Sequence, residues 1–228
     1  TMLIRANTLA KGRSGVRPQT VETLIAMLNA GVHPIIPAKG SVGACGDLAP
    51  LSHLMLVLCK PETGEDNENE SGEAIYQGQR MSGLQAMARA GIERLVLEAK
   101  EGLALNNGAT FSAAMAALAV RDADNLLANA ELALAMSLDA MRGFRDAYLP
   151  LVHQSGHPGQ QGVAERVLQM LDGSELVQGS EYEEPHVLPP QDAYSLRCAP
   201  QVLGAVYDAL DFVRGVVSRE MNAATDNP

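Results

Sequence analysis

The chain contains no tryptophan and only three phenylalanines and three cysteines among its 228 residues. Cys45, Cys59 and Cys198 are too few and too scattered for a disulfide framework or a zinc site, and they suit a reducing cytoplasm. Basic residues are also scarce, because 17 Lys and Arg stand against 27 Asp and Glu, a formal net charge of −10. This acidic balance argues against nucleic acid as a partner. We see neither a signal peptide nor an apolar run long enough for a bilayer, which predicts a soluble, cytoplasmic protein without a membrane partner.

Helical apolar spacing dominates the rest of the chain and predicts an all-α bundle in a single helical domain over residues 1–228. Strand content should be a few per cent at most, with a small turn or hairpin at residues 75–80. Proline and glycine indicate loops at residues 150–162 and 181–190. The expected helices cover residues 20–31, 48–58, 82–90, 92–102, 109–142 and about 200–224.

The most informative segment is residues 40–53, which read GSVGACGDLAPLSH. Ala44, Cys45 and Gly46 are small, so backbone atoms can approach each other closely there. The amide nitrogen of Gly46 could attack the carbonyl carbon of Ala44 and close a five-membered ring. Elimination at Cys45 would then leave an exocyclic methylene, an electrophile made from main chain. For the tripeptide taken alone, a tight turn ahead of a helix explains the same residues.

The longer segment closely resembles the signature of the histidine and aromatic amino acid ammonia-lyases, which usually carry serine where this chain has Cys45. Four other segments resemble further motifs of that family in the same order: residues 3–17, 101–108, 191–198 and 220–228. The resemblance therefore covers essentially the whole chain. It implies an elongated bundle of long antiparallel helices with the loop at a helix N-terminus. It also implies that Ala44-Cys45-Gly46 cyclises to 4-methylidene-imidazole-5-one (MIO), losing hydrogen sulfide where serine would lose water. No metal is implied, and the histidines show no metal-ligand spacing.

The resemblance assigns roles to single residues. Asn107 would hydrogen-bond the MIO ring, Tyr194 would lie over it and assist proton handling, and Arg197 would bind the substrate carboxylate through its planar fork. Three positions would support them: Gln191 and Asn227 as polar pocket lining, and Asp47 as a support of cyclisation and loop geometry. Without the motifs, Asn107 and Asp47 are read as helix caps. Tyr194 is then read as packing and Arg197 as a surface ion pair.

The implied function is elimination of ammonia from L-histidine to give trans-urocanate, because residues 31–43 and 194–198 look like the histidine branch. Phenylalanine or tyrosine ammonia-lyase and 2,3-aminomutase are alternatives. A non-catalytic helical assembly domain that retains the fold is an alternative of another class. Family members are much longer and take a catalytic tyrosine, a glutamate and a phenylalanine from regions without a counterpart here, so the isolated chain should be inactive. A homotetramer is implied, with each active site built from three chains.

Overall fold

The computed structural model describes residues 1–42, 46–63, 65–179 and 191–226. Helices contain 61% of the residues and strands 7%, so the predicted helical fold class is confirmed, with more strand than expected. Residue contacts divide the chain into two compact units. Unit 1 comprises Thr1–Ala117 and Val217–Pro228, and unit 2 comprises Leu118–Val216. The single domain over residues 1–228 stays a prediction.

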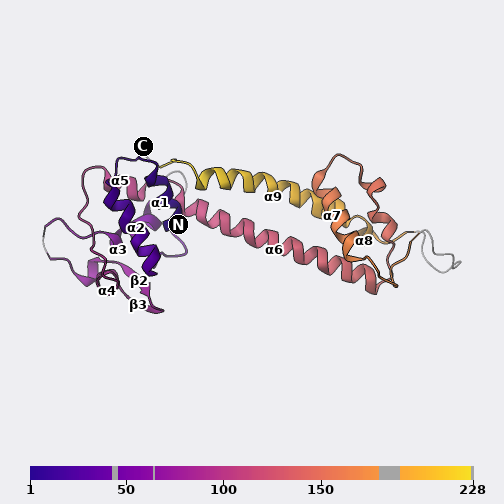
Figure 1. The fold of residues 1–228 in the computed structure, drawn as a ribbon, viewed down its shortest axis with the longest axis horizontal. Helices are drawn as coiled ribbons and strands as arrows, with labels where there is room; N and C mark the ends of the chain where they lie inside the picture. Colours follow the sequence, from indigo (N-terminus) through magenta and orange to yellow (C-terminus); the bar gives the residue numbers. More distant parts are fainter. Residues whose placement is uncertain (43–45, 64, 180–190, 227–228) are drawn as a thin grey trace. The chain divides into compact units, whose positions relative to one another are not determined.

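Unit 1 packs short helices around one apolar core (Figure 1). Leu9, Leu24, Leu54 and Leu105 are at most 1% exposed in this core, which joins four helices distant in sequence. The elements of this unit are α1 (Met2–Ala10), α2 (Pro18–Ala30), β1 (His33–Pro34), α3 (Leu48–Leu58), η1 (Glu68–Glu70), β2 (Glu73–Tyr76), β3 (Gln79–Ser82), α4 (Gly83–Arg89), α5 (Glu101–Asn106) and the start of α6 (Thr110–Ala140).

A three-stranded antiparallel sheet of order β1-β2-β3 lies in this unit. The turn between β2 and β3 consists of Gln77 and Gly78, whose φ angles are 49° and 75°. Two successive positive φ angles match the right-handed twist of the flanking strands, and glycine tolerates such an angle without strain. The predicted hairpin is therefore confirmed.

Two local predictions in unit 1 were wrong for tertiary reasons. Residues 92–102 do not form one helix, because Leu95 is extended: its N–H donates to Leu58 O at 2.9 Å and its carbonyl accepts from Lys60 N at 2.8 Å. Helix α2 begins at Pro18, with proline at the first helical position, rather than at Thr20. The Thr20 hydroxyl donates instead to the Glu101 carboxylate at 2.6 Å. Both segments are thus determined by partners far away in the sequence.

Unit 2 is built on the remainder of α6 and most of α9 (Ala199–Met221), which run antiparallel (Figure 1). Arg214 on α9 contacts Asp124 near the middle of α6 at 2.6 Å, whereas Leu203 packs against the apolar cluster that contains Leu138, near the end of α6. The other elements are η2 (Arg145–Tyr148), η3 (Pro150–His153), α7 (Pro158–Met170) and α8 (Tyr194–Arg197).

The loop predicted at residues 150–162 was partly wrong, because α7 begins at Pro158. Proline suits the first turn of a helix, where its missing N–H has no partner in any case, so Pro158 marks a helix start. The second predicted loop, at residues 181–190, lies outside the described residues.

The stretch Glu101–Ala140 corrects the expectation that no apolar run is long enough for a bilayer. It contains an 18-residue window of mean hydropathy 1.3, of which 33% is buried. By length and composition alone, it meets the test for a helix that could cross a membrane. Core helices pass the same test. Helix α6 also makes polar contacts with other parts of the chain, through Ser112 with Asp47 and through Glu131 with Arg166. The stretch is therefore weak support for a membrane span.

Candidate active site

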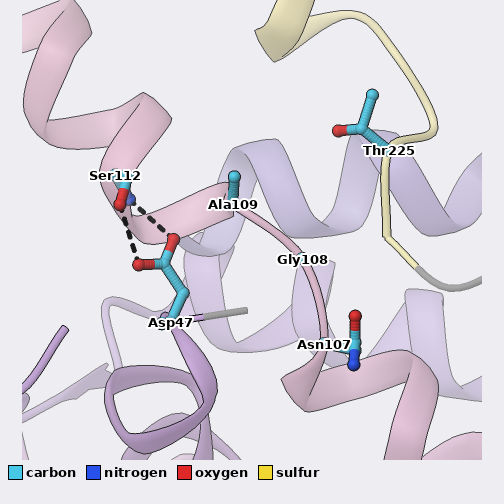
Figure 2. A pocket seen from close by; sticks show the side chains of 7 residues that line it. Asp47, Asn107, Gly108, Ala109, Ser112 and Thr225 are labelled. Carbon is cyan, nitrogen blue, oxygen red and sulfur yellow. Dashed lines mark hydrogen bonds between the residues drawn. The ribbon is translucent and has the colours of Figure 1, made fainter. Parts of the chain in front are cut away.

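A pocket of about 230 Å³ in unit 1 joins three separate segments of the chain (Figure 2). These segments are the loop before α3, the turn between α5 and α6 together with the first turn of α6, and the segment after α9. The lining residues are Gly46, Asp47, Asn107, Gly108, Ala109, Ser112 and Thr225. Three of the predicted site residues, Gly46, Asp47 and Asn107, are thus brought together here.

Asp47 is 2% exposed and stands just before α3, but its side chain makes no capping hydrogen bond to that helix. Its carboxylate accepts from Ser112 N and Ser112 Oγ, each at 2.8 Å, as Figure 2 shows. Ser112 lies in the first turn of α6, where backbone N–H groups have no partner within the helix. Asp47 therefore caps α6, and its negative charge complements the positive end of that helix.

The loop that carries the predicted triplet is held on both sides. Ser41 donates its hydroxyl to Asp47 Oδ1 at 2.7 Å, and Val42 N donates to Gly46 O at 3.1 Å. Ala44 and Cys45 themselves lie outside the described residues, together with residue 43. A ring between residues 44 and 46 requires the two ends of the segment to be held close together. The contacts of Val42, Gly46 and Asp47 hold the residues on either side of the triplet together, so the described residues fit the MIO group.

Asn107 reaches the pocket because the chain turns sharply after α5. Asn107 ends that helix with extended backbone, φ −90° and ψ 147°, and Gly108 follows with φ +112°. A Cβ at Gly108 would be strained by this φ and would lie 3.0 Å from Asp226 Cα. The turn therefore requires glycine, and it places Asn107 beside the segment that follows α9.

The first residue of α5 anchors this turn from the other end. Glu101 is 1% exposed and accepts five hydrogen bonds: from Arg17 N, Nε and Nη2 at 2.9, 3.1 and 2.7 Å, from Thr20 Oγ1 at 2.6 Å and from Glu98 N at 2.8 Å. Burial raises the pKa of Glu101, but the hydrogen bonds from Arg17, Thr20 and the two backbone N–H groups outweigh it and lower the pKa to about 2. The ionised Glu101 thus fixes α5, and with it Asn107.

Three further predicted residues, Gln191, Tyr194 and Arg197, lie in unit 2. Gln191 and Arg197 line a pocket of about 310 Å³. Arg197 Nε is buried without a hydrogen-bond partner in the described part of the chain. The Arg197 guanidinium carbon lies 4.5 Å from the centroid of the Tyr194 ring, and Tyr194 is 71% exposed. Asn227 lies outside the described residues. Within the described ranges, we find no group of three His, Cys, Asp or Glu residues that could hold a metal ion.

Sequence reasoning missed the residues that hold this site. Ser41 and Ser112 carry no motif of their own, and their only signal was position: one precedes the triplet and the other lies in the first turn of a long helix. Glu101 belongs to a quoted motif, but its type gave no hint that it anchors α5. Arg17 and Thr20 became visible as its partners only in the fold.

Known proteins define the class of this helical chain. The sequence profile described as aromatic amino acid lyase matches residues 1–228. The chain is similar to a histidine ammonia-lyase from Gloeobacter violaceus, with 52% identity over all of this chain and 42% of that protein. Two solved structures are similar to all of it: a histidine ammonia-lyase from Trypanosoma cruzi (38% identity, TM-score 0.80, 39% of that chain) and a phenylalanine aminomutase from Pantoea agglomerans (32% identity, TM-score 0.85, 44% of that chain).

The chain belongs to the aromatic amino acid lyase family, which confirms the resemblance stated above. It spans about 42% of the length of the curated relatives that it matches.

Proposed function

We propose that the protein carrying this chain removes ammonia from L-histidine and gives trans-urocanate. The observation that carries the proposal is the unit 1 pocket, in which Gly46 of the triplet faces the same space as Asn107. Similarity to a histidine ammonia-lyase at 52% identity supports histidine as the substrate. Phenylalanine and tyrosine lyases and aminomutases remain the alternatives, because a phenylalanine aminomutase also shares the fold.

The residues of unit 1 would build and hold the reactive group. MIO, formed from Ala44, Cys45 and Gly46, would supply an electrophile that converts the amine into a better leaving group. Asp47 would keep the loop against α6 through Ser112. The Asn107 side-chain amide would donate a hydrogen bond to the ring. The positive end of α6 would favour negative charge at this place, although Asp47 already offsets part of it.

The elimination also needs a base. The Cα–N bond breaks, and a proton leaves Cβ as the double bond forms, so a group must accept that proton. Among the described residues that line the unit 1 pocket, Asp47 is the only ionisable one, and its two carboxylate oxygens already accept three hydrogen bonds. We therefore place the base outside this chain.

The residues of unit 2 would bind the substrate. Arg197 Nε, which has no hydrogen-bond partner among the described residues, supports the assignment of Arg197 to the substrate carboxylate, because a guanidinium fork binds a carboxylate through two parallel hydrogen bonds. Stacking on Tyr194 would hold the guanidinium plane in one orientation. Gln191 shares the pocket of Arg197, and we retain both Gln191 and Asn227 as polar lining residues.

We further propose a homotetramer in the cytoplasm. In unit 2, α6 and α9 expose large apolar side chains: Leu126 is 71%, Met136 65% and Phe212 72% exposed. Apolar patches of this kind mark association surfaces. Sedimentation showing a stable monomer at micromolar concentration would contradict this assembly.

The experiment combines intact mass with a substrate panel on the complete protein that carries this chain. We expect a mass lower by one water and one hydrogen sulfide, and conversion of L-histidine to trans-urocanate. Turnover of only phenylalanine or tyrosine, or a product that retains the amine, would select one of the alternatives. A folded protein with an unmodified mass and no turnover would support the non-catalytic assembly domain.

A matched pair of serine variants tests the loop support. Ser112→Ala removes a hydroxyl that bonds Asp47, whereas Ser52→Ala removes one that bonds only the Leu48 carbonyl of its own helix. We expect Ser112→Ala to lower the cyclised fraction seen by mass, and Ser52→Ala to leave it unchanged. Equal cyclisation in the two variants would remove Ser112 from the support of the loop.

A further inference from the structure

Arg5 on α1 is a fully buried arginine, and two of its three guanidinium nitrogens have no hydrogen-bond partner in the described ranges. It is 0% exposed, and its Nη1 donates to Ala104 O at 3.1 Å. Its Nε and Nη2 are buried and have no hydrogen-bond partner among the described residues. A guanidinium carries five N–H donors, and leaving them unsatisfied in the interior costs free energy. Such an arrangement persists only where something else compensates the charge.

The compensating charge is Asp226, which follows α9. Both of its carboxylate oxygens are buried, again without a partner in the described part of the chain. A Cβ at Gly108 would lie 3.3 Å from Arg5 Nη2 and 3.2 Å from Asp226 Cβ. Arg5 Nη2 and the Cβ of Asp226 thus lie on the same side of Gly108, close to one point.

Arg5 and Asp226 also attract each other electrostatically. Burial lowers the pKa of Arg5 to about 10, and attraction to Asp226, followed by Asp47, opposes this lowering. Arg5 therefore carries its charge at neutral pH, and Asp226 is the carboxylate that attracts it most.

Helix α1 holds the segment after α9 by independent contacts. Asn7 Nδ2 donates to Met221 O at 2.9 Å, and Thr8 Oγ1 donates to Ala223 O at 3.3 Å. Arg5 extends this row of contacts toward Asp226, and Thr225 beside it lines the pocket. Neither Arg5 nor Asp226 lines the pocket itself.

We propose that Arg5 and Asp226 form a buried charge pair that positions Asn107 in the pocket. The pair draws the segment after α9 against the turn at Gly108, where only a residue without Cβ permits the approach. It thereby fixes the backbone on which Asn107 stands. The catalytic consequence rests on the function proposed above, whereas the coupling between the two residues does not.

Unit 1 contains a matched control pair, Arg94 and Asp66. Arg94 is 5% exposed, donates to backbone carbonyls that include Val57 O at 3.1 Å, and contacts the Asp66 carboxylate. It is thus another buried arginine paired with an aspartate in the same unit. Neither member lines the pocket of Asn107.

The test is a double-mutant cycle in the complete protein, with Arg5→Met, Asp226→Asn and the double variant. Arg94→Met and Asp66→Asn are the control cycle. We expect the unfolding equilibrium constant to show a coupling of about fivefold or more between Arg5 and Asp226. We also expect faster hydrogen exchange in residues 104–112 for Arg5→Met, and no such change there for Arg94→Met. If Arg5→Met does not fold, the rate of hydrogen exchange at residues 104–112 in Asp226→Asn decides by itself whether the proposal holds.

Kinetics supplies the readout that a merely structural role would not change. If the enzyme acts on histidine, Arg5→Met should lower kcat about tenfold more than it changes KM, because Asn107 acts on the reactive group rather than on substrate affinity. An additive cycle, or equal exchange at residues 104–112 in the Arg5 and Arg94 variants, overturns the charge pair. Coupling and local exchange without any lyase activity would overturn the proposed function and leave the pair standing.

Discussion

Glu101 in unit 1 and Arg197 in unit 2 both belong to segments that resemble family motifs, but the fold treats them in opposite ways. Glu101 is surrounded by five donors. Arg197 keeps a buried Nε without a partner in the described ranges. A satisfied buried charge holds the backbone together, whereas an unsatisfied one at a pocket is free for a ligand. The contrast separates the residue that builds the site from the residue that would bind substrate.

The contrast extends to the two units. Unit 1 uses buried carboxylates to join distant segments, as Asp47 joins its loop to α6 and Glu101 joins α2 to α5. Unit 2 exposes Tyr194 and the apolar sides of its long helices. Buried carboxylates therefore hold unit 1 together, while the exposed apolar side chains of α6 and α9 suit unit 2 to association.

Replacing Glu101 should have the largest effect on folding. Glu101→Ala leaves Arg17 and the donors of Thr20 and Glu98 without their acceptor, so the free energy of unfolding should fall by about 4 kcal/mol. Urea denaturation measures the loss. Glu98→Ala is the control, because this exposed side chain makes one contact of 3.5 Å and should cost less than about 1 kcal/mol. Equal losses for the two variants would contradict the anchoring role.

Acid should weaken the same hydrogen bonds to Glu101. The folded pKa of Glu101, about 2, lies below its ordinary value of 4.5. Ionised Glu101 therefore stabilises the fold above pH 4.5, and this contribution is lost as the pH falls from 4.5 toward 2. The loss should approach about 3 kcal/mol. Comparing urea midpoints of the wild type and Glu101→Gln across this window isolates it, and parallel pH profiles would refute it.

On the side of unit 2, Arg197→Lys should damage catalysis in the complete protein. Lysine keeps the charge but loses the fork, so kcat/KM for histidine should fall by the equivalent of about 1–3 kcal/mol. The mass that reports ring formation should not change. Arg121→Lys, in an exposed ion pair with Asp122, is the control and should leave kcat/KM intact. Unchanged kinetics in Arg197→Lys would exclude it from carboxylate binding.

Substitution of Arg166 tests whether unit 2, like unit 1, is held together by a buried carboxylate with its hydrogen-bond donors. Its Nε and Nη2 donate to the buried Glu131 carboxylate at 2.8 and 2.6 Å, and its guanidinium lies 4.6 Å from the Tyr207 ring centroid. Arg166→Lys loses the fork and the stacking, and should lower the free energy of unfolding by about 1 kcal/mol. Arg214→Lys, in an exposed pair, should cost less. A larger loss for Arg214→Lys would reverse this order.

The smallest folding effect is expected at Leu126 on α6. Because it is 71% exposed, Leu126→Gln should change the free energy of unfolding by less than about 0.5 kcal/mol. It should nevertheless weaken the proposed tetramer, as measured by sedimentation. Leu176→Gln, which lies outside the long helices and is 42% exposed, is the control. An unchanged tetramer in Leu126→Gln would place the interface elsewhere.

Local signals predicted much of the fold. Helix α3 has the expected bounds Leu48–Leu58, α6 is one long helix, and the hairpin turns at Gln77 and Gly78. Apolar periodicity, helix propensity and glycine act within a few residues, so they can be read directly. The extended residues around Leu95 could not be predicted, because their hydrogen bonds go to Leu58 and Lys60.

The candidate site, too, has residues that the sequence predicted and residues that it did not. Motif resemblance named Gly46, Asp47 and Asn107, and the structure places all three at one pocket. It named neither Ser112 nor the pair of Arg5 and Asp226, because these residues acquire their meaning only from neighbours brought together by folding.

Asp47 shows most plainly what the sequence by itself determined and what the tertiary structure decided. The order of small residues, aspartate and apolar helix placed the loop at the start of α3, and local reasoning made Asp47 the cap of that helix. In the fold its carboxylate bonds Ser112 of α6 instead. The first turn of α6 offers Asp47 both a free backbone N–H and a hydroxyl. Which helix receives a carboxylate depends on which donors folding brings within reach, and no local pattern contains that information.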